Sequence, residues 1–359
     1  MCTEKGWDLS MFKSHTPLFL DDRKKELEGS IAIIEQVTIG GIKQTIMIRG
    51  RDRHQPILLF LHGGPGFGQI GFIRRYQEEL ENHFVIVHWD QRGAGKSNSY
   101  VSPATFTIDQ FVSDTHELIQ YLLNRFQQNK IYLVGHNWGS IIGILTASLY
   151  PELIHAYIGM SQLVEPQESE WVSYQLTLDH SVKTAHHRAT KQLYLIGDPP
   201  YRRSEKRKIL YHWLNSFGGV IRFRSFSHMI LSGFISSEYT WLDWWKWKQG
   251  QSKSSKYLSL ELKQVNLYKQ VPKLEVPFFL MMGRYDVVNP VQIQEHYFHY
   301  IEAPIKEIIW YHNSAHFPHI EEPIPYMVQL LRIKENIHLA KRKGNLLFLS
   351  QNQAPVLPL

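Results

Sequence analysis

The chain has 359 residues, enough to bury a large core and to form one large domain with an insertion, or two domains. Hydrophobic residues make up 43% and charged residues 20% of it, which is ordinary for a soluble globular protein. The net charge of +6, from 39 basic and 33 acidic side chains, is mild for this length. Because no clustered basic stripe or recognised binding motif accompanies it, no nucleic-acid partner is expected.

No targeting signal is expected, because residues 1–22 contain no apolar run long enough for the core of a signal peptide. No run of about 18 apolar residues occurs, so we expect no membrane span and no membrane partner. Cys2 is the only cysteine, which excludes an intrachain disulfide and agrees with a reducing compartment. We therefore expect a cytoplasmic protein, and the sequence predicts no particular oligomeric state.

Short apolar segments of strand length recur along the chain. The first two, 31–37 and 44–50, flank a tight turn at Gly40–Gly41. Continuous apolar runs typical of strands buried on both faces follow at 56–62, 83–90, 130–136, 156–162, 277–286 and 305–316.

Helical patterns separate these strands. The segment 107–126 begins with Thr107 and Gln110 at the spacing of a capping box. Its apolar residues fall on one helix face: Ile108, Phe111, Val112, Ile119, Leu122, Leu123 and Phe126. Alternating strands and helices predict an α/β fold with a mostly parallel sheet, in which ligands bind at the carboxyl ends of the strands.

The alternation stops between residues 164 and 258, which we predict to be a helical cap on a core formed by 1–163 and 259–359. This stretch is rich in aromatic residues, and its tryptophans are Trp171, Trp213, Trp241, Trp244, Trp245 and Trp247. We expect most of these aromatic side chains to form the core of the cap and some to line a pocket. The basic stretch 201–208 is interpreted as a solvated helix face.

Two loops that follow predicted strands have distinctive sequences. In HGGPG, residues 62–66, successive glycines let the backbone turn sharply and direct an N–H group at a developing oxyanion. In WDQRGAGKS, residues 89–97, we expect Asp90 and Arg92 to form a buried pair that braces the loop.

The segment GHNWG, residues 135–139, lies between a strand and a helix. It matches the Gly-x-Ser-x-Gly elbow of hydrolases except that Asn137 occupies the apex. Gly135 and Gly139 suit a close crossing of strand and helix, and the Trp138 N–H is a candidate oxyanion donor. The neighbouring His136 is interpreted as structural.

An acid and a histidine follow the last two predicted strands. Asp286 follows one of them and His316 the other, so that apex, acid and histidine come in the chain order of an α/β-hydrolase triad. Asp286 is expected to orient the imidazole, and His316 to act as general base. His319 is a competing candidate that we rank second, because Ala315 and His316 come directly after the apolar strand.

Together, these motifs resemble the proline iminopeptidase-like branch of the α/β-hydrolase fold over residues 30 to 335. The resemblance implies a helical cap, no metal or cofactor, and cleavage of an amide or ester bond in a small substrate or short peptide. It also implies that the N–H groups of Gly64 and Trp138 form the oxyanion hole, and that Asp286 and His316 complete the triad. Family members bind the substrate's amine through cap glutamates. Glu165, Glu168 and Glu170 are the possible equivalents here, although we favour their interpretation as surface charges at the start of the cap.

Asn137 departs from this family, whose apex residue is serine. Asn137 has no hydroxyl for His316 to deprotonate, so acyl-enzyme formation should fail. Ser140 lies one helical turn further and is not expected to replace it.

Three hypotheses remain open. The chain is a hydrolase that has lost its nucleophile and is greatly impaired, or a binding protein that holds a ligand in the old pocket without turnover. In the third hypothesis, hydrolysis converts Asn137 to aspartate, with His316 as base. The elbow would then resemble that of haloalkane dehalogenases and epoxide hydrolases, in which a carboxylate attacks carbon, although residues 89–97 favour the peptidase branch.

Overall fold

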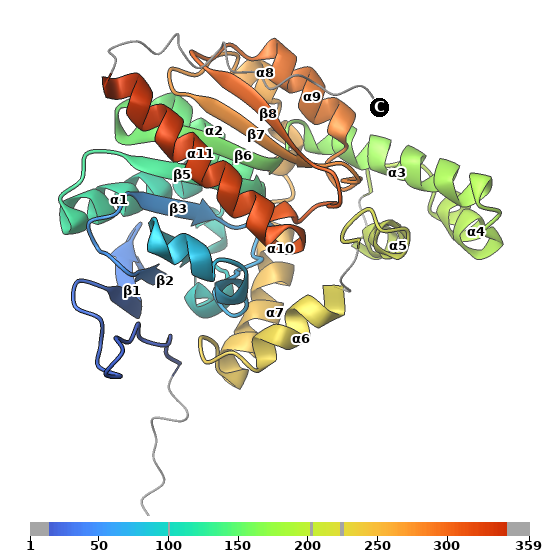
Figure 1. Cartoon of the computed structure of the whole chain (residues 1–359). Coiled ribbons are helices and arrows are strands. Elements are labelled where there is room, and N and C mark those ends of the chain that lie inside the picture. The colour runs from blue at the N-terminus through green and yellow to red at the C-terminus, as the bar shows by residue number, and fades with distance from the viewer. Residues whose placement is uncertain (1–13, 100, 202–203, 223–225, 343–359) are drawn as a thin grey trace, which may run out of the picture.

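The computed structural model describes residues 14–342 except 100, 202–203 and 223–225. Cys2, part of the basic stretch 201–208 and the tail from residue 343 therefore lie outside the described residues. At the centre is a sheet with strand order β1-β2-β4-β3-β5-β6-β7-β8 (Figure 1). The strands are β1 (Ile31–Ile39), β2 (Ile42–Gly50), β3 (Ile57–Leu61), β4 (Val85–Asp90), β5 (Ile131–Asn137), β6 (Ile154–Gln162), β7 (Phe278–Gly283) and β8 (Lys306–Tyr311). Strand β2 pairs antiparallel with β1 and β4, and the remaining pairs are parallel.

Helices cover both faces of this sheet (Figure 1). Side chains alternate between the faces of a strand, so Leu59 and Leu61 belong to one hydrophobic core and Leu58 and Phe60 to another. The first core includes residues of α1 (Ile108–Phe126), α2 (Trp138–Leu149) and α9 (Val291–Tyr300). The second includes residues of α11 (Pro323–Arg342). The short helices are α8 (Leu267–Gln270) and α10 (Pro318–Glu321). The predicted α/β class is confirmed, and the inner strands β3, β4, β5 and β7 are buried on both faces.

Helix α1 begins with half of the predicted capping box. The hydroxyl of Thr107 accepts a hydrogen bond from the Gln110 N–H at 3.2 Å, as expected of an N-cap. The side chain of Gln110 does not return to the Thr107 backbone. It donates instead to Asp114 at 2.7 Å, because the buried Asp114 carboxylate lies one turn along the same helix face.

Among the described residues, five helices lie within the range 164–258, which the sequence predicts to be a cap. They are α3 (Pro166–Lys183), α4 (His187–Ile196), α5 (Ser204–Ser216), α6 (Phe226–Phe234) and α7 (Trp241–Tyr257). Trp213, Trp244 and Trp247 are buried in a shared hydrophobic core, as expected. Trp171, Trp241 and Trp245 are exposed, which departs from the expectation that most of the aromatic side chains are buried.

A segment that precedes the sheet contacts the cap. The His15 N–H donates to the Ser237 carbonyl at 2.9 Å, and the Thr16 hydroxyl donates to Glu238 at 3.1 Å. Arg49 of β2 donates to the same Thr16 hydroxyl at 2.7 Å. Residues 14–17, which we call the N-terminal strap, thus connect the loop between α6 and α7 to the sheet.

Within the described residues, no helix combines the length and the apolar character needed to cross a membrane.

Candidate active site

Asn137 lies at the sharp turn between β5 and α2. Its backbone has φ 50° and ψ −115°, a left-handed region that a side chain larger than glycine rarely adopts. The close crossing behind this turn uses glycines: a Cβ on Gly139 would lie 2.2 Å from the Leu61 carbonyl oxygen, and one on Gly135 would lie 2.5 Å from the Gly139 carbonyl oxygen. The predicted tight elbow is therefore present, with Asn137 at its apex.

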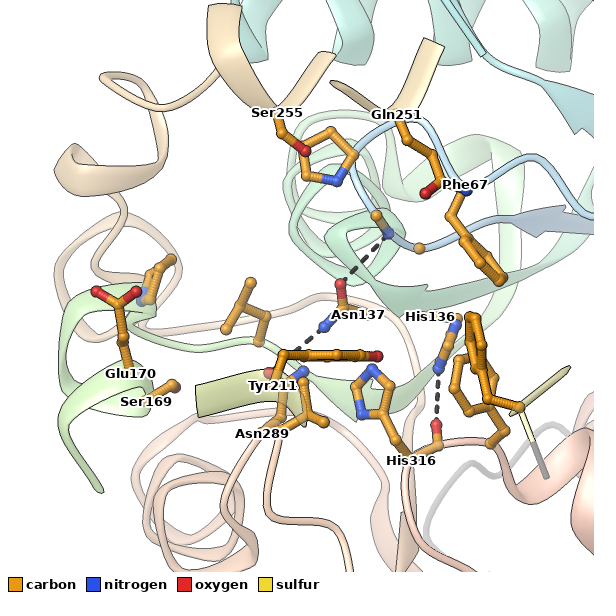
Figure 2. Close-up of a pocket in the computed structure, with 18 residues that line it drawn as sticks. Phe67, His136, Asn137, Ser169, Glu170, Tyr211, Gln251, Ser255, Asn289 and His316 are labelled. Carbon is orange, nitrogen blue, oxygen red and sulfur yellow. Dashed lines mark hydrogen bonds between the residues drawn. The ribbon is translucent and has the colours of Figure 1, made fainter. Parts of the chain in front are cut away.

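The Asn137 carboxamide is held at both ends (Figure 2). Its oxygen accepts a hydrogen bond from the Gly64 N–H at 3.4 Å, and its nitrogen donates to Asn289 Oδ1, also at 3.4 Å. The Asn289 amide nitrogen donates to the Ser161 carbonyl at 2.6 Å, which leaves Oδ1 of Asn289 facing Asn137. The Gly64 N–H, which the resemblance assigns to the oxyanion, is therefore already hydrogen-bonded to the Asn137 carboxamide.

Ser140 does not face the pocket. Its buried hydroxyl donates to the Asn137 carbonyl at 2.5 Å and accepts from the Leu163 N–H at 2.9 Å. Both hydrogen bonds hold the elbow in place. The serine nearest in sequence to the apex is thus engaged in the fold.

Trp138 is the first residue of α2, so its N–H has no partner within the helix. The indole is buried, donates to Gln91 at 2.9 Å and packs edge-on against Phe111. These contacts anchor the first turn of α2 directly behind Asn137.

Asp286 and His316 form a buried pair. His316 Nδ1 lies 3.1 and 3.0 Å from the two carboxylate oxygens of Asp286. Oδ1 also accepts the N–H groups of Val288 and Asn289, each at 3.0 Å, which fixes the carboxylate. With its proton on Nδ1, His316 presents the bare Nε2, the tautomer that a general base requires. Both residues lie farther from their strands than predicted, because β7 ends at Gly283 and β8 at Tyr311.

A pocket of about 450 Å³ lies over these groups. The core contributes Gly63, Gly64, Pro65, Phe67, His136, Asn137, Leu163, Val288, Asn289, His316 and Phe317 to its lining. The cap contributes Pro166, Ser169, Glu170, Tyr211, Phe226, Gln251 and Ser255. Aromatic side chains from both parts therefore surround the apex, while the cap tryptophans do not line this pocket.

The three candidate cap glutamates differ in position. Glu170 lines the pocket, accepts a hydrogen bond from Arg207 Nε and another from the Tyr201 N–H at 3.3 Å. Glu165 accepts from Asn266 at 3.1 Å, Glu168 is exposed, and neither lines the pocket.

The predicted pair between Asp90 and Arg92 is wrong. Arg92 binds the buried Asp114 of α1 at 2.9 and 3.0 Å. Asp90 instead accepts the Tyr239 hydroxyl at 2.5 Å and the Lys96 N–H at 2.8 Å. Burial raises the pKa of Asp90 to about 7. Arg92 thus braces the loop against α1, and Asp90 connects the loop to the cap.

Comparison with known proteins places this geometry in a family. A family model described as alpha/beta hydrolase fold matches residues 56–218. The probable aminopeptidase YbaC of Bacillus subtilis (strain 168) is 39% identical over 298 residues, which cover 82% of this chain and 93% of that protein. The chain belongs to the α/β-hydrolase fold family.

Two further likenesses are more limited. Human Epoxide hydrolase 4 is 32% identical over 104 residues, which cover 29% of this chain and 27% of that protein. A crystal structure of proline iminopeptidase from Mycobacterium smegmatis matches with a TM-score of 0.66 at 14% identity, covering 86% of this chain and 99% of that one. The latter likeness concerns the fold alone.

Sequence reasoning missed several pocket residues of this α/β hydrolase. Asn289 stands three residues after Asp286, and its N–H bonds back to that carboxylate, a local Asx-type pattern that could have indicated it. Tyr211, Phe226 and Gln251 come from cap helices, whose placement over the sheet no local pattern indicates.

Buried histidines cluster beside His316. His136 Nε2 donates to the His316 carbonyl at 2.8 Å, which supports its predicted structural role, and its Nδ1 has no partner among the described residues. His319 lies against His136, Phe60 and Tyr326, and does not line the pocket. Burial first, and neighbouring histidines second, hold the pKa values of His136 and His319 well below their ordinary value.

These histidines predict that acid destabilises this α/β hydrolase. Burial lowers the pKa of His62 to about 4 and that of His88 to about 3, from 6.5. Below pH 6.5 the unfolded chain binds protons that these four native histidines exclude, so each removes about 1.4 kcal/mol of stability per pH unit as the pH falls towards its folded pKa. Urea unfolding at pH 6.5 and 5.5 should show the lower free energy of unfolding at pH 5.5.

Two carboxyls oppose this trend. The pKa values of Asp90 and Glu81 are raised by burial, so that the native state retains their protons and gains stability as the pH falls. Because four histidines oppose two carboxyls, we expect a net loss of stability as the pH falls. Replacing the exposed His54 by glutamine should leave the trend unchanged; equal stability at the two pH values would contradict the prediction.

Proposed function

We propose that this chain is an α/β hydrolase of the proline iminopeptidase-like type, whose pocket accepts an amide or ester bond of a small substrate or short peptide. Asn137 stands where the nucleophilic serine would be and greatly impairs turnover. The observation that carries this proposal is that His316, held by the buried Asp286 carboxylate, lines one pocket with an elbow apex that lacks only a hydroxyl.

The proposed chemistry is acyl transfer. With serine at position 137, Nε2 of His316 would take the hydroxyl proton while Oγ attacks the substrate carbonyl carbon. The N–H groups of Gly64 and Trp138 would bind the resulting oxyanion. The amine or alcohol would leave with the proton from His316, and water would then hydrolyse the acyl-enzyme. Asparagine has no hydroxyl to begin this sequence.

Within this proposal, Glu170 is the glutamate placed to meet a substrate amine, since it lines the pocket. It already binds Arg207 and the Tyr201 N–H, so an incoming ammonium group would share the carboxylate with them. The aromatic side chains of Phe67, Tyr211 and Phe226 favour an apolar substituent beside the scissile bond.

A second candidate function is ligand binding without turnover. It is favoured by the Asn137 carboxamide, which satisfies the Gly64 N–H and Asn289 Oδ1 together. If this function holds, an amide or ester ligand raises the melting temperature of the unaltered chain without being consumed.

The same contacts argue against conversion of Asn137 to aspartate. A carboxylate there would place an oxygen against Asn289 Oδ1, and turning the Asn289 amide would break its hydrogen bond to the Ser161 carbonyl. The elbow peptide is therefore expected to have the mass of its asparagine form.

A fluorophosphonate probe tests the proposed site directly. It is expected to label the Asn137→Ser variant, as Oγ bonds to phosphorus and fluoride leaves, and to leave the unaltered chain unlabelled. Intact-mass spectrometry followed by peptide mapping locates the adduct. Asn137→Ala serves as control and should stay unlabelled. A folded Asn137→Ser variant that resists the probe would contradict the hydrolase proposal.

A further inference from the structure

Large apolar side chains are exposed on one pair of cap helices. Trp241 is 77% exposed and Ile235 is 74% exposed, far more than the other tryptophans of α7 that pack inward. The exposed set comprises Leu231, Phe234, Ile235, Trp241, Leu242 and Trp245, which we call the α6–α7 apolar surface. Large apolar side chains gathered in this way mark an interaction site more often than scattered ones do.

These side chains form one continuous surface. Trp241 and Trp245 are four residues apart on α7, and Leu231 and Ile235 are four apart where α6 ends, so each pair shares a helix face. The Phe234 and Trp241 rings lie 5.4 Å apart and join the two faces. Figure 1 shows α6 and α7 side by side at the lower edge of the molecule.

The exposed charged side chains of α7 itself are positive. The acidic residues between 226 and 260 are Glu238 and Asp243, and both are buried in ion pairs, with Arg74 at 2.6 Å and with Lys96 at 2.6 Å. Lys248 and Lys256 are exposed on α7, at positions that share a helix face with Trp241 and Trp245. The exposed apolar side chains therefore lie at the start of α7, and the exposed lysines lie further along the same helix.

We propose that the α6–α7 apolar surface docks onto an anionic lipid bilayer. Tryptophan rings suit the boundary between head groups and acyl chains, where an apolar face enters and lysines contact anionic lipids. A second copy of this chain fits less well, because a symmetric contact would bring Lys248 and Lys256 towards their own equivalents. The sequence expectation of no membrane partner rested on the absence of a spanning segment, which peripheral docking does not need.

This inference does not depend on the proposed function of the pocket. The pocket is lined by other residues of the same helices, Phe226 of α6 and Gln251 and Ser255 of α7. The two sites therefore use different residues of one pair of helices.

Co-sedimentation of the full chain with lipid vesicles tests the proposal. At physiological salt the chain is expected to bind vesicles of phosphatidylcholine with phosphatidylglycerol, and to bind pure phosphatidylcholine vesicles at least about tenfold more weakly. The double variant Trp241→Ser/Trp245→Ser should lose binding by about tenfold or more. A matched control, Tyr194→Ser/Leu195→Ser, removes two exposed apolar side chains from α4 and should bind as the unaltered chain does.

A second variant separates docking from damage to the fold. Lys248→Glu/Lys256→Glu changes only exposed side chains and should abolish the preference for anionic vesicles without lowering the melting temperature. Absence of vesicle binding, equal binding to both vesicle types, or equal loss in the α4 control would overturn the proposal. So would a dimer in ultracentrifugation that the tryptophan variant converts to monomer.

Discussion

Asn137→Ser is expected to raise hydrolysis of aminoacyl anilides or short-chain esters by roughly 10³- to 10⁶-fold, or about 4 to 8 kcal/mol of activation free energy. Loss of the nucleophile alone costs a serine protease about 10⁶-fold, while its oxyanion hole and binding groups retain about 10³-fold over water. The elbow, the Asp286–His316 pair and the pocket are all assembled here. Serine would also free the Gly64 N–H from the carboxamide.

The measurement is kcat/KM for the variant and the unaltered chain on one substrate panel. Asn137→Ala is the matched control, since it removes the carboxamide without supplying a hydroxyl, and it should stay at background. Addition of His316→Gln to the serine variant should remove most of the gain. A serine variant that is silent on the panel and also resists the fluorophosphonate would favour ligand binding as the function.

Gly139→Ala is expected to lower the free energy of unfolding by about 3 kcal/mol or more. The new Cβ would lie 2.2 Å from the Leu61 carbonyl oxygen and 2.7 Å from the His62 carbonyl oxygen, and both acceptors belong to backbone that cannot rotate away. The helix propensity of alanine returns only about 1 kcal/mol, so the clash decides the sign.

Urea unfolding of the two proteins measures this difference. Gly41→Ala is the control: its Cβ would meet open space, and the cost of its φ of +74° should be about 1 to 2 kcal/mol. Equal losses in the two variants would mean that the crossing of β3 and α2 adjusts to a methyl group. In that case the close elbow would have no steric requirement for glycine.

The α/β class and the approximate positions of the strands could be predicted because buried strands appear in the sequence as short continuous apolar runs, separated by segments with helical periodicity. The elbow residues, Asp286 and His316 were found from their positions after strands, since parallel strands bring their carboxyl ends to one edge of a sheet. The ends of β7 and β8 were placed too late, since β7 ends at Gly283 and β8 at Tyr311 and the polar residues that follow belong to the loops that carry Asp286 and His316.

The partners of side chains that bond to distant elements could not be predicted from the sequence. Arg92 and Asp90 are two residues apart, yet each bonds to an element distant in the chain, Asp114 of α1 and Tyr239 of the cap. The double contact of the Asn137 carboxamide likewise depends on Asn289, more than a hundred residues away. Such choices follow from tertiary packing rather than from local pattern.

The N-terminal strap affects how the cap could be transplanted onto the core of another protein. The His15 N–H binds the Ser237 carbonyl, and Thr16 lies between Glu238 and Arg49 of β2. The cap is thus held by residues near the N-terminus as well as by its own two connections to the core. A chimaera that transplants 164–258 onto another core would leave Glu238 without Thr16, whereas co-transplanting 14–17 with an arginine at the equivalent of Arg49 would retain the Thr16 bridge between Glu238 and that arginine.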